Sequence, residues 1–280
     1  MLLISVFITF FLVSKGQYCH PKEGEVLNGL YVPSHRDFNV VSYPHLREAD
    51  VMWSKRIWRV LDLREKINHS LYFPVDPIPS RTSYMQMIMH YLTCENAEIT
   101  LTPYDILDDE FTVRLTKSEV IAKSFSKEEF AFENEDGDME TREVDNPFEF
   151  SSVKRLRLKE EWFFDNQRSV METRIIGVCP VMEMFDEMGE YKGEKPLVWL
   201  YFPELRIPMS ITAMFNTKNR AATITYDQLF MKRMFSSYIY KKSNVFDRKI
   251  DTYKQDLDLL LESKQIEHEI FEFEQDLWEY

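Results

Sequence analysis

The chain has 280 residues, of which 44% are hydrophobic, and a formal net charge of −13 at pH 7. The length suits one large domain or two modest lobes, and the negative charge argues against nucleic-acid binding and favours basic partners or solubility alone. Only 7 glycines occur, which argues against extended phosphate-cradling loops.

The N-terminus has the pattern of a secretory signal. Leu2–Val13 is an apolar run that is short for a bilayer span but suits the hydrophobic part of a signal peptide. Ser14 and Gly16 stand at −3 and −1 of a cut before Gln17, so we predict residues 1–16 to be a signal peptide. No Lys or Arg precedes the run, and a buried N-terminal strand or helix is the alternative.

Residues 17–43 carry Gly, Pro, His and charge without periodicity, which is typical of an exposed leader or linker. The bulky Tyr18 before Cys19 argues against a lipid on that cysteine. Cleavage would remove Lys15 and move the net charge from −13 to −14.

Residues 44–132 are predicted to form a helical N-terminal lobe with a small strand. Apolar side chains recur at helical spacing from Ala49 onward, which predicts a first long helix. A second helix is expected at about 82–92, a short strand at 98–102, and a helix opened by the capping-box pattern Thr116-x-x-Glu119. The stripe of the first helix comprises Trp53, Ile57, Val60, Leu61 and Ile67.

Residues 133–150 are strongly acidic and contain Gly137 and Pro147. This composition is typical of a solvated loop, and we predict an acidic linker between two lobes.

Residues 151–280 are predicted to form an α+β lobe. Alternating apolar and charged side chains around 156–164 indicate a half-buried strand, and further strands are expected at 171–181 and 197–202. Their short polar connections predict an antiparallel β-meander. A helix starting at the capping residue Thr225 follows, and the overall fold class is α+β, with the meander packed by C-terminal helices.

A final helix is expected from about 247 to 278. Its early apolar stripe and its late stripe lie nearly opposite each other at about 100° per residue. Either the helix breaks near Ser263, or it contacts two different partners. The early stripe comprises Tyr253, Leu257, Leu260 and Leu261, and the late stripe comprises Ile266, Ile270, Phe273 and Leu277.

The sequence predicts no catalytic, cofactor-binding or metal-binding residues. The six histidines form no HExxH pair and none has a cysteine at ligand spacing, as a zinc site would need. Cys94 and Cys179 lie among apolar residues, where free cysteines behave as small buried hydrophobes, and a bridge between these two is the alternative.

Candidate interface residues combine exposed aromatic rings with basic neighbours, a composition enriched at protein interfaces. On the expected helices, Trp58 and Phe235 point away from the apolar stripes, and a helix buried on two sides is the alternative. The candidate set is Trp58, Arg59, Lys55, Phe235, Phe273 and Trp278.

Four long motifs resemble the GldN/PorN family of gliding-motility and type IX secretion proteins. They are Arg47–Asn68, Trp162–Pro180, Lys232–Ile239 and Phe273–Tyr280. The resemblance extends from about Arg36 to the C-terminus and departs from the family in the short leader and the uncharged start of the signal.

The resemblance implies a non-enzymatic scaffold in the periplasm. Such a subunit would oligomerise in a ring complex under the outer membrane, held there by a lipoprotein partner of the GldK/PorK type and by other secretion and motility subunits. The alternative from the residues alone is an exported hydrolase that uses an unidentified carboxylate pair.

Overall fold

The computed structural model describes residues 39–78, 81–94, 99–124, 127–133, 139–145, 148–186, 190–216, 219 and 223–277, with the backbone alone for 127–133 and 139–145. The predicted signal peptide and Trp278 lie outside the described residues. Helices and strands are both abundant, and the fold class is α+β as predicted.

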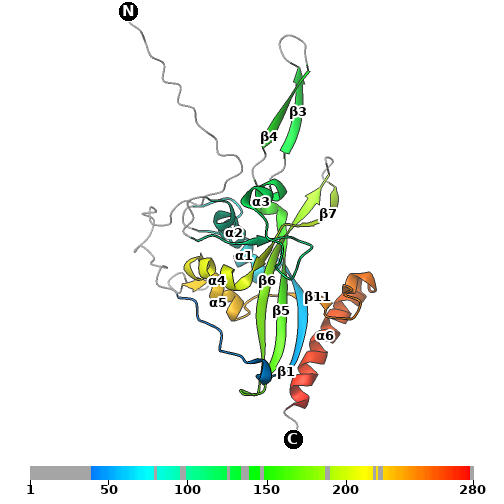
Figure 1. The fold of residues 1–280 in the computed structure, drawn as a ribbon. Coiled ribbons are helices and arrows are strands. Elements are labelled where there is room, and N and C mark those ends of the chain that lie inside the picture. The colour runs from blue at the N-terminus through cyan, green and yellow to red at the C-terminus, as the bar shows by residue number, and fades with distance from the viewer. Residues whose placement is uncertain are drawn as a thin grey trace, which may run out of the picture.

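A long antiparallel sheet forms the centre of the molecule (Figure 1). Its strand order is β11-β1-β5-β6-β8-β2, and β7 also pairs with β6. The strands are β1 (Val51–Asp62), β2 (Pro103–Tyr104), β5 (Val153–Asp165), β6 (Val170–Phe185), β7 (Tyr191–Pro196), β8 (Trp199–Tyr201) and β11 (Tyr238–Lys242). Two separate hairpins pair β3 (Lys127–Glu133) with β4 (Met139–Asp145) and β9 (Ala213–Met214) with β10 (Ile224–Thr225).

The helices lie around this sheet. They are α1 (His69–Tyr72), α2 (Tyr84–Thr93), α3 (Lys117–Ser124), α4 (Phe202–Ile211), α5 (Tyr226–Met231) and α6 (Asp256–Asp276). Helices α4 and α5 lie on the β6 side of the sheet, and α6 lies beside β11 and β1 (Figure 1). The predicted antiparallel arrangement of β5, β6 and β8 is confirmed.

The first long helix predicted from Ala49 is wrong, because Val51–Asp62 is strand β1. It pairs with β5 along its length and with β11 at its second half. Residues Ile57 to Leu61 are buried on both faces of the sheet, so the period-two alternation that identifies a half-exposed strand is absent. The β-branched and aromatic side chains of this segment suit such a buried strand.

Other predicted elements differ in extent. The helix capped by Thr225 ends at Met231 and the chain then enters β11, although the cap itself is confirmed by the 3.3 Å bond from the Gln228 amide to Thr225 Oγ1. The strand predicted at 98–102 is wrong, since β2 is at Pro103–Tyr104. The acidic segment predicted as a loop contains β4.

The largest core lies between the sheet and helices α2, α4 and α5. Its centre is a group of fully buried rings: Tyr84, Phe202, Tyr226 and Phe230. Residues on both sides of the acidic segment contribute to this core and to the sheet. The lobe boundaries proposed from the sequence stay a prediction.

Candidate functional site

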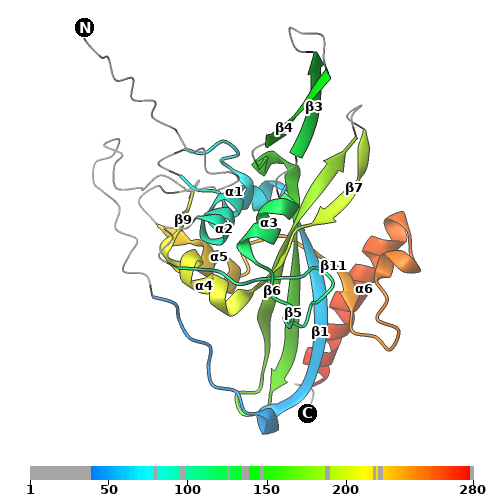
Figure 2. The same cartoon turned by 45° about the horizontal axis from the view of Figure 1, so that its top comes forward.

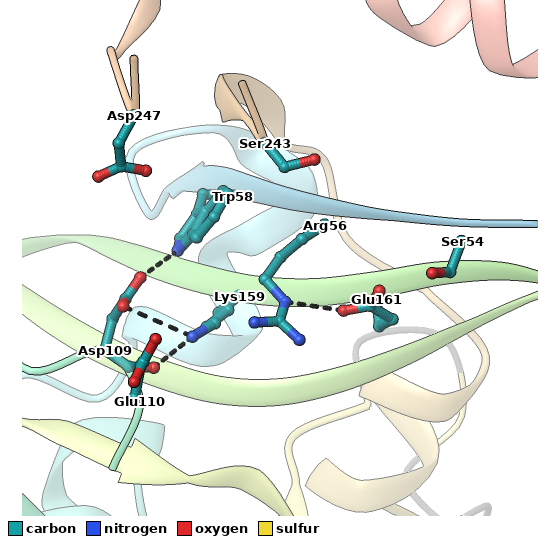
Figure 3. A pocket seen from close by; sticks show the side chains of 9 residues that line it. All are labelled: Ser54, Arg56, Trp58, Asp109, Glu110, Lys159, Glu161, Ser243 and Asp247. Atoms are coloured by element: carbon teal, nitrogen blue, oxygen red, sulfur yellow. Dashed lines mark hydrogen bonds and ion pairs between the residues drawn. The ribbon is translucent and has the colours of Figure 1, made fainter. Parts of the chain in front are cut away.

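A polar pocket of about 470 Å³ lies on the sheet where the segment between β2 and α3 crosses β1 and β5. Figure 2 shows this crossing segment in front of the strands. Figure 3 shows the nine lining side chains, which come from β1, β5, the crossing segment and the turn after β11: Ser54, Arg56, Trp58, Asp109, Glu110, Lys159, Glu161, Ser243 and Asp247.

Asp109 connects the crossing segment to β1 and β5 at the wall of the pocket. Trp58 Nε1 donates to Asp109 Oδ2 at 3.0 Å, and the ammonium group of Lys159 donates to the Asp109 carbonyl oxygen while lying 3.6 Å from Oδ1. Burial lowers the pKa of Lys159, and the charge of Asp109 opposes this effect. The amino group of Lys241 lies 4.2 Å from the centre of the Trp58 ring, which adds a cation–π contact.

Two of the three remaining carboxylates of the pocket also contact cations. Glu161 accepts from Arg56 at 2.7 Å, and Asp247 lies 2.7 Å from the Lys241 ammonium group. A general acid or base must instead be able to exchange a proton with a substrate. The pocket is lined mainly by polar and charged side chains, and carboxylates held in this way do not favour the alternative of a hydrolase that uses a carboxylate pair.

An interface was proposed at Trp58 and Arg59 because a surface helix would expose them, and the structure removes that reason. Trp58 is 6% exposed and Arg59 is 7% exposed, because β1 is a central strand and not a surface helix. Trp58 packs with Tyr104 and Trp199 on one face of the sheet. An interface at these two residues stays a prediction.

Arg59 and Lys55 connect β1 to α6. Arg59 forms an ion pair with Glu267 and donates from Nε to Ser237 Oγ at 2.8 Å. Lys55 lies 3.8 Å from Glu269. Alternate residues of a strand point to opposite faces, which explains why Trp58 faces the pocket while its neighbours Ile57 and Arg59 face α6.

Phe235 and Phe273 are partly buried within the chain. Phe235 packs against the main core with its ring centre 5.5 Å from that of Phe230. Phe273 stacks on Trp53 at 4.7 Å and so helps to fix α6 to β1.

One buried ion pair was not identified from the sequence. Glu160 is fully buried on β5, and its carboxylate lies 2.9 Å from Arg233 and accepts from Trp162 Nε1 at 3.1 Å. Arg233 follows α5, so this contact links the α5 turn to the sheet. Glu160 and Glu161 are adjacent in a charged sequence, and only the pleat, which turns them to opposite faces, distinguishes the buried one.

The two described cysteines differ. Cys94 is disulfide-bonded, whereas Cys179 is a free and buried thiol. The alternative prediction of a disulfide between Cys94 and Cys179 is therefore wrong. The expectation of a free, buried cysteine is confirmed for Cys179.

The part of the chain that the structure describes contains neither a candidate metal cluster nor a candidate membrane-spanning helix. Within it, no group of three or more His, Cys, Asp or Glu side chains could hold a metal ion. Of the helices placed there, none combines the length and the apolar composition needed to cross a bilayer.

The protein is an α+β chain built on one long antiparallel sheet, with a charged pocket on the sheet and an acidic C-terminal helix beside it. Residues 46–279 match the family described as gliding motility associated protein GldN. The chain belongs to the GldN family, as its four motifs indicated, and is a component of the gliding motility and type IX secretion machinery. No curated protein sequence matches it.

Proposed function

We propose that the chain is a non-enzymatic scaffold subunit in the periplasm that forms a ring with further copies of itself. It is held at the outer membrane by a lipoprotein partner of the GldK/PorK type and contacts other motility and secretion subunits. The family match over most of the chain carries this proposal.

The cysteines support export. A disulfide at Cys94 is expected in an oxidising compartment such as the periplasm and is rare in the cytosol. Besides the free Cys179, the sequence contains one further cysteine, Cys19. We expect peptide mapping without reduction to find Cys94 cross-linked to Cys19, which also requires that Cys19 carry no lipid. A free Cys94 thiol in protein from the periplasm would remove this support.

The net charge supports a basic partner surface. At −13 over the whole chain, the protein should associate with such a surface faster at low ionic strength. Association rates that do not respond to salt would mean that the charge serves solubility alone.

Assembly is tested by co-expressing the mature protein with a lipid-free form of the lipoprotein partner. Light scattering on the co-purified material should give a mass of many subunits of both proteins. A mature protein that stays monomeric with the partner present would contradict the scaffold proposal. The hydrolase alternative has no observation in its favour among the described residues, where three of the four pocket carboxylates, Asp109, Glu161 and Asp247, contact Lys or Arg.

A further inference from the structure

Helix α6 carries a second apolar stripe on its outward side. Leu257, Leu260, Leu261 and Phe271 are between 47% and 67% exposed. At about 100° per residue they fall on one side of the helix, opposite the buried Ile266 and Ile270. Leu257, Leu261, Lys264, His268 and Phe271 follow one another at alternating intervals of four and three, the spacing of a seam that packs against another helix.

The inner side of α6 is already fixed to the sheet, so the outward stripe is a stable feature of the folded chain. Ile266 and Ile270 are buried against Ile57 and Ile239 of β1 and β11. Ser263 Oγ accepts the Ile239 amide at 2.8 Å. The helix is continuous through Ser263, so the two apolar stripes belong to one straight element and cannot both face the sheet.

Acidic side chains flank the outward stripe on both sides. By helical geometry, Asp258, Glu272 and Asp276 lie on one flank and the half-buried Glu274 lies on the other. The basic groups within the stripe are Lys264 and His268, and His268 is paired with Glu272 at 3.0 Å. A partner whose apolar stripe is flanked by basic groups would therefore meet complementary charge on both sides.

We propose that the outward stripe of α6 binds an amphipathic helix of another protein, in which leucine-like side chains are flanked by Lys and Arg. The flanking charges disfavour the other two occupants of such a stripe. A second copy of α6 would bring acidic flanks against acidic flanks, and an anionic lipid surface would be repelled. The inference concerns the surface of a single chain and does not depend on the proposed ring or on the lipoprotein partner.

The test measures binding of two synthetic amphipathic helices to the full mature protein by fluorescence anisotropy. Both peptides carry the same leucine stripe, one flanked by lysines and the other by glutamates. The lysine-flanked helix should bind and the glutamate-flanked helix should not. Leu257→Ser/Leu261→Ser should weaken binding about tenfold or more, as expected for central apolar contacts. Leu107→Ser, which changes a leucine 94% exposed elsewhere on the surface, should leave it unchanged.

A charge swap separates this site from general attraction to an acidic protein. Asp258→Lys/Glu272→Lys should weaken the lysine-flanked helix and allow the glutamate-flanked helix to bind. Because all the changed side chains are exposed, unfolding curves of the variants should match the parent chain. Equal binding of both peptides, or no effect of the double serine variant, overturns the proposal.

Two further outcomes would identify a different occupant and also overturn the proposal. Sedimentation showing self-association that Leu257→Ser/Leu261→Ser abolishes would identify a second copy of the chain. Flotation with phosphatidylglycerol vesicles that the same variant abolishes would identify a lipid surface.

Discussion

Replacing Trp58 by alanine separates the helical interpretation of this segment from the observed strand. On a surface helix, an exposed Trp58 beside Arg59 would be an interface hot spot, and its loss would weaken partner binding by about 2 kcal/mol or more with little effect on folding. In the structure, Trp58 is 6% exposed and packs with Tyr104, Cys179 and Trp199. The substitution should therefore reduce the stability of the single chain.

The magnitude follows from what the indole ring contacts. Removing a buried aromatic side chain costs about 3–5 kcal/mol, because apolar contacts are lost and a cavity remains. The change also removes the 3.0 Å bond to Asp109 and the contact with Lys241. A hydrogen bond to a charged group contributes about 1.5–3 kcal/mol. Trp58→Phe, which keeps an aromatic ring but loses the donor, should therefore cost less than the alanine variant.

Urea unfolding of the mature chain and both variants measures these differences directly. The alanine variant should show a lower midpoint with an unchanged slope, and a loss of about 3–5 kcal/mol in unfolding free energy. Leu107→Ala serves as the matched control, since Leu107 is 94% exposed. If Trp58→Ala unfolds within about 1 kcal/mol of the parent chain and only partner binding falls, the burial argument is refuted.

Three further predictions test the helix, the thiol and export. Truncation before Ser263 should cost several kcal/mol of folding free energy, because it removes the buried Ile266 and Ile270, each contributing about 1.5–3 kcal/mol; an unchanged melting temperature would contradict the packing described. Burial raises the pKa of Cys179 to about 12 from 9.0, so the folded thiol keeps its proton where the unfolded thiol has lost it. The free energy of unfolding should therefore not depend on this thiol below pH 9, and should fall by about 1.4 kcal/mol per pH unit between pH 9 and pH 12. The Cys179→Ala variant should lack this decline. Mass spectrometry of exported protein should find Gln17 at the N-terminus, whereas an intact Met1 would exclude the predicted signal cleavage.

Strand β5 and helix α2 were predictable from their local sequence patterns. Strand β5 alternates buried Leu156 and Leu158 with the less buried Arg155 and Arg157, which is the period-two pattern of a half-buried strand. Helix α2 was found from its periodicity, and its start is fixed by a capping box between Ser83 and Gln86. In both cases, the local pattern and the tertiary environment favour the same structure.

Strand β1 and helix α4 were not predictable in the same way. In β1 the run Ile57–Leu61 is buried throughout, and its apolar positions also fit a helical stripe, so hydrophobic spacing alone does not distinguish the two structures. Helix α4 was not predicted, and only its first residue, Phe202, falls within the strand expected at 197–202. Its sequence contains Pro203 and Pro208, which are unfavourable in most helical positions. Pro203 is compatible with the first helical turn, whereas Pro208 is tolerated in the interior only because packing against the core compensates for the lost hydrogen bond.

The candidate site depends even more on tertiary contacts. The pocket brings together Trp58, Asp109 and Lys159, which are far apart in the sequence, and no spacing rule connects them. Trp58 and Lys159 are directly opposite each other in the β1–β5 register. Only this register, together with the segment that crosses it, makes Asp109 the shared partner of both side chains.

The packing of α6 separates its acidic side chains into two groups. Glu267 and Glu269 are close to Arg59, Lys55 and Lys242 on the sheet, so positive groups of β1 and β11 compensate their charge. Asp258, Glu272 and Asp276 on one flank of the outward stripe are exposed, so an approaching protein would meet an apolar surface bordered by negative charge. The acidic residues of α6 and its early apolar stripe are independent features of the sequence, and the helix leaves Asp258, Glu272 and the leucines of the stripe exposed. Since long-range attraction acts before contact is made, a basic amphipathic helix would be drawn towards the stripe and then held by it.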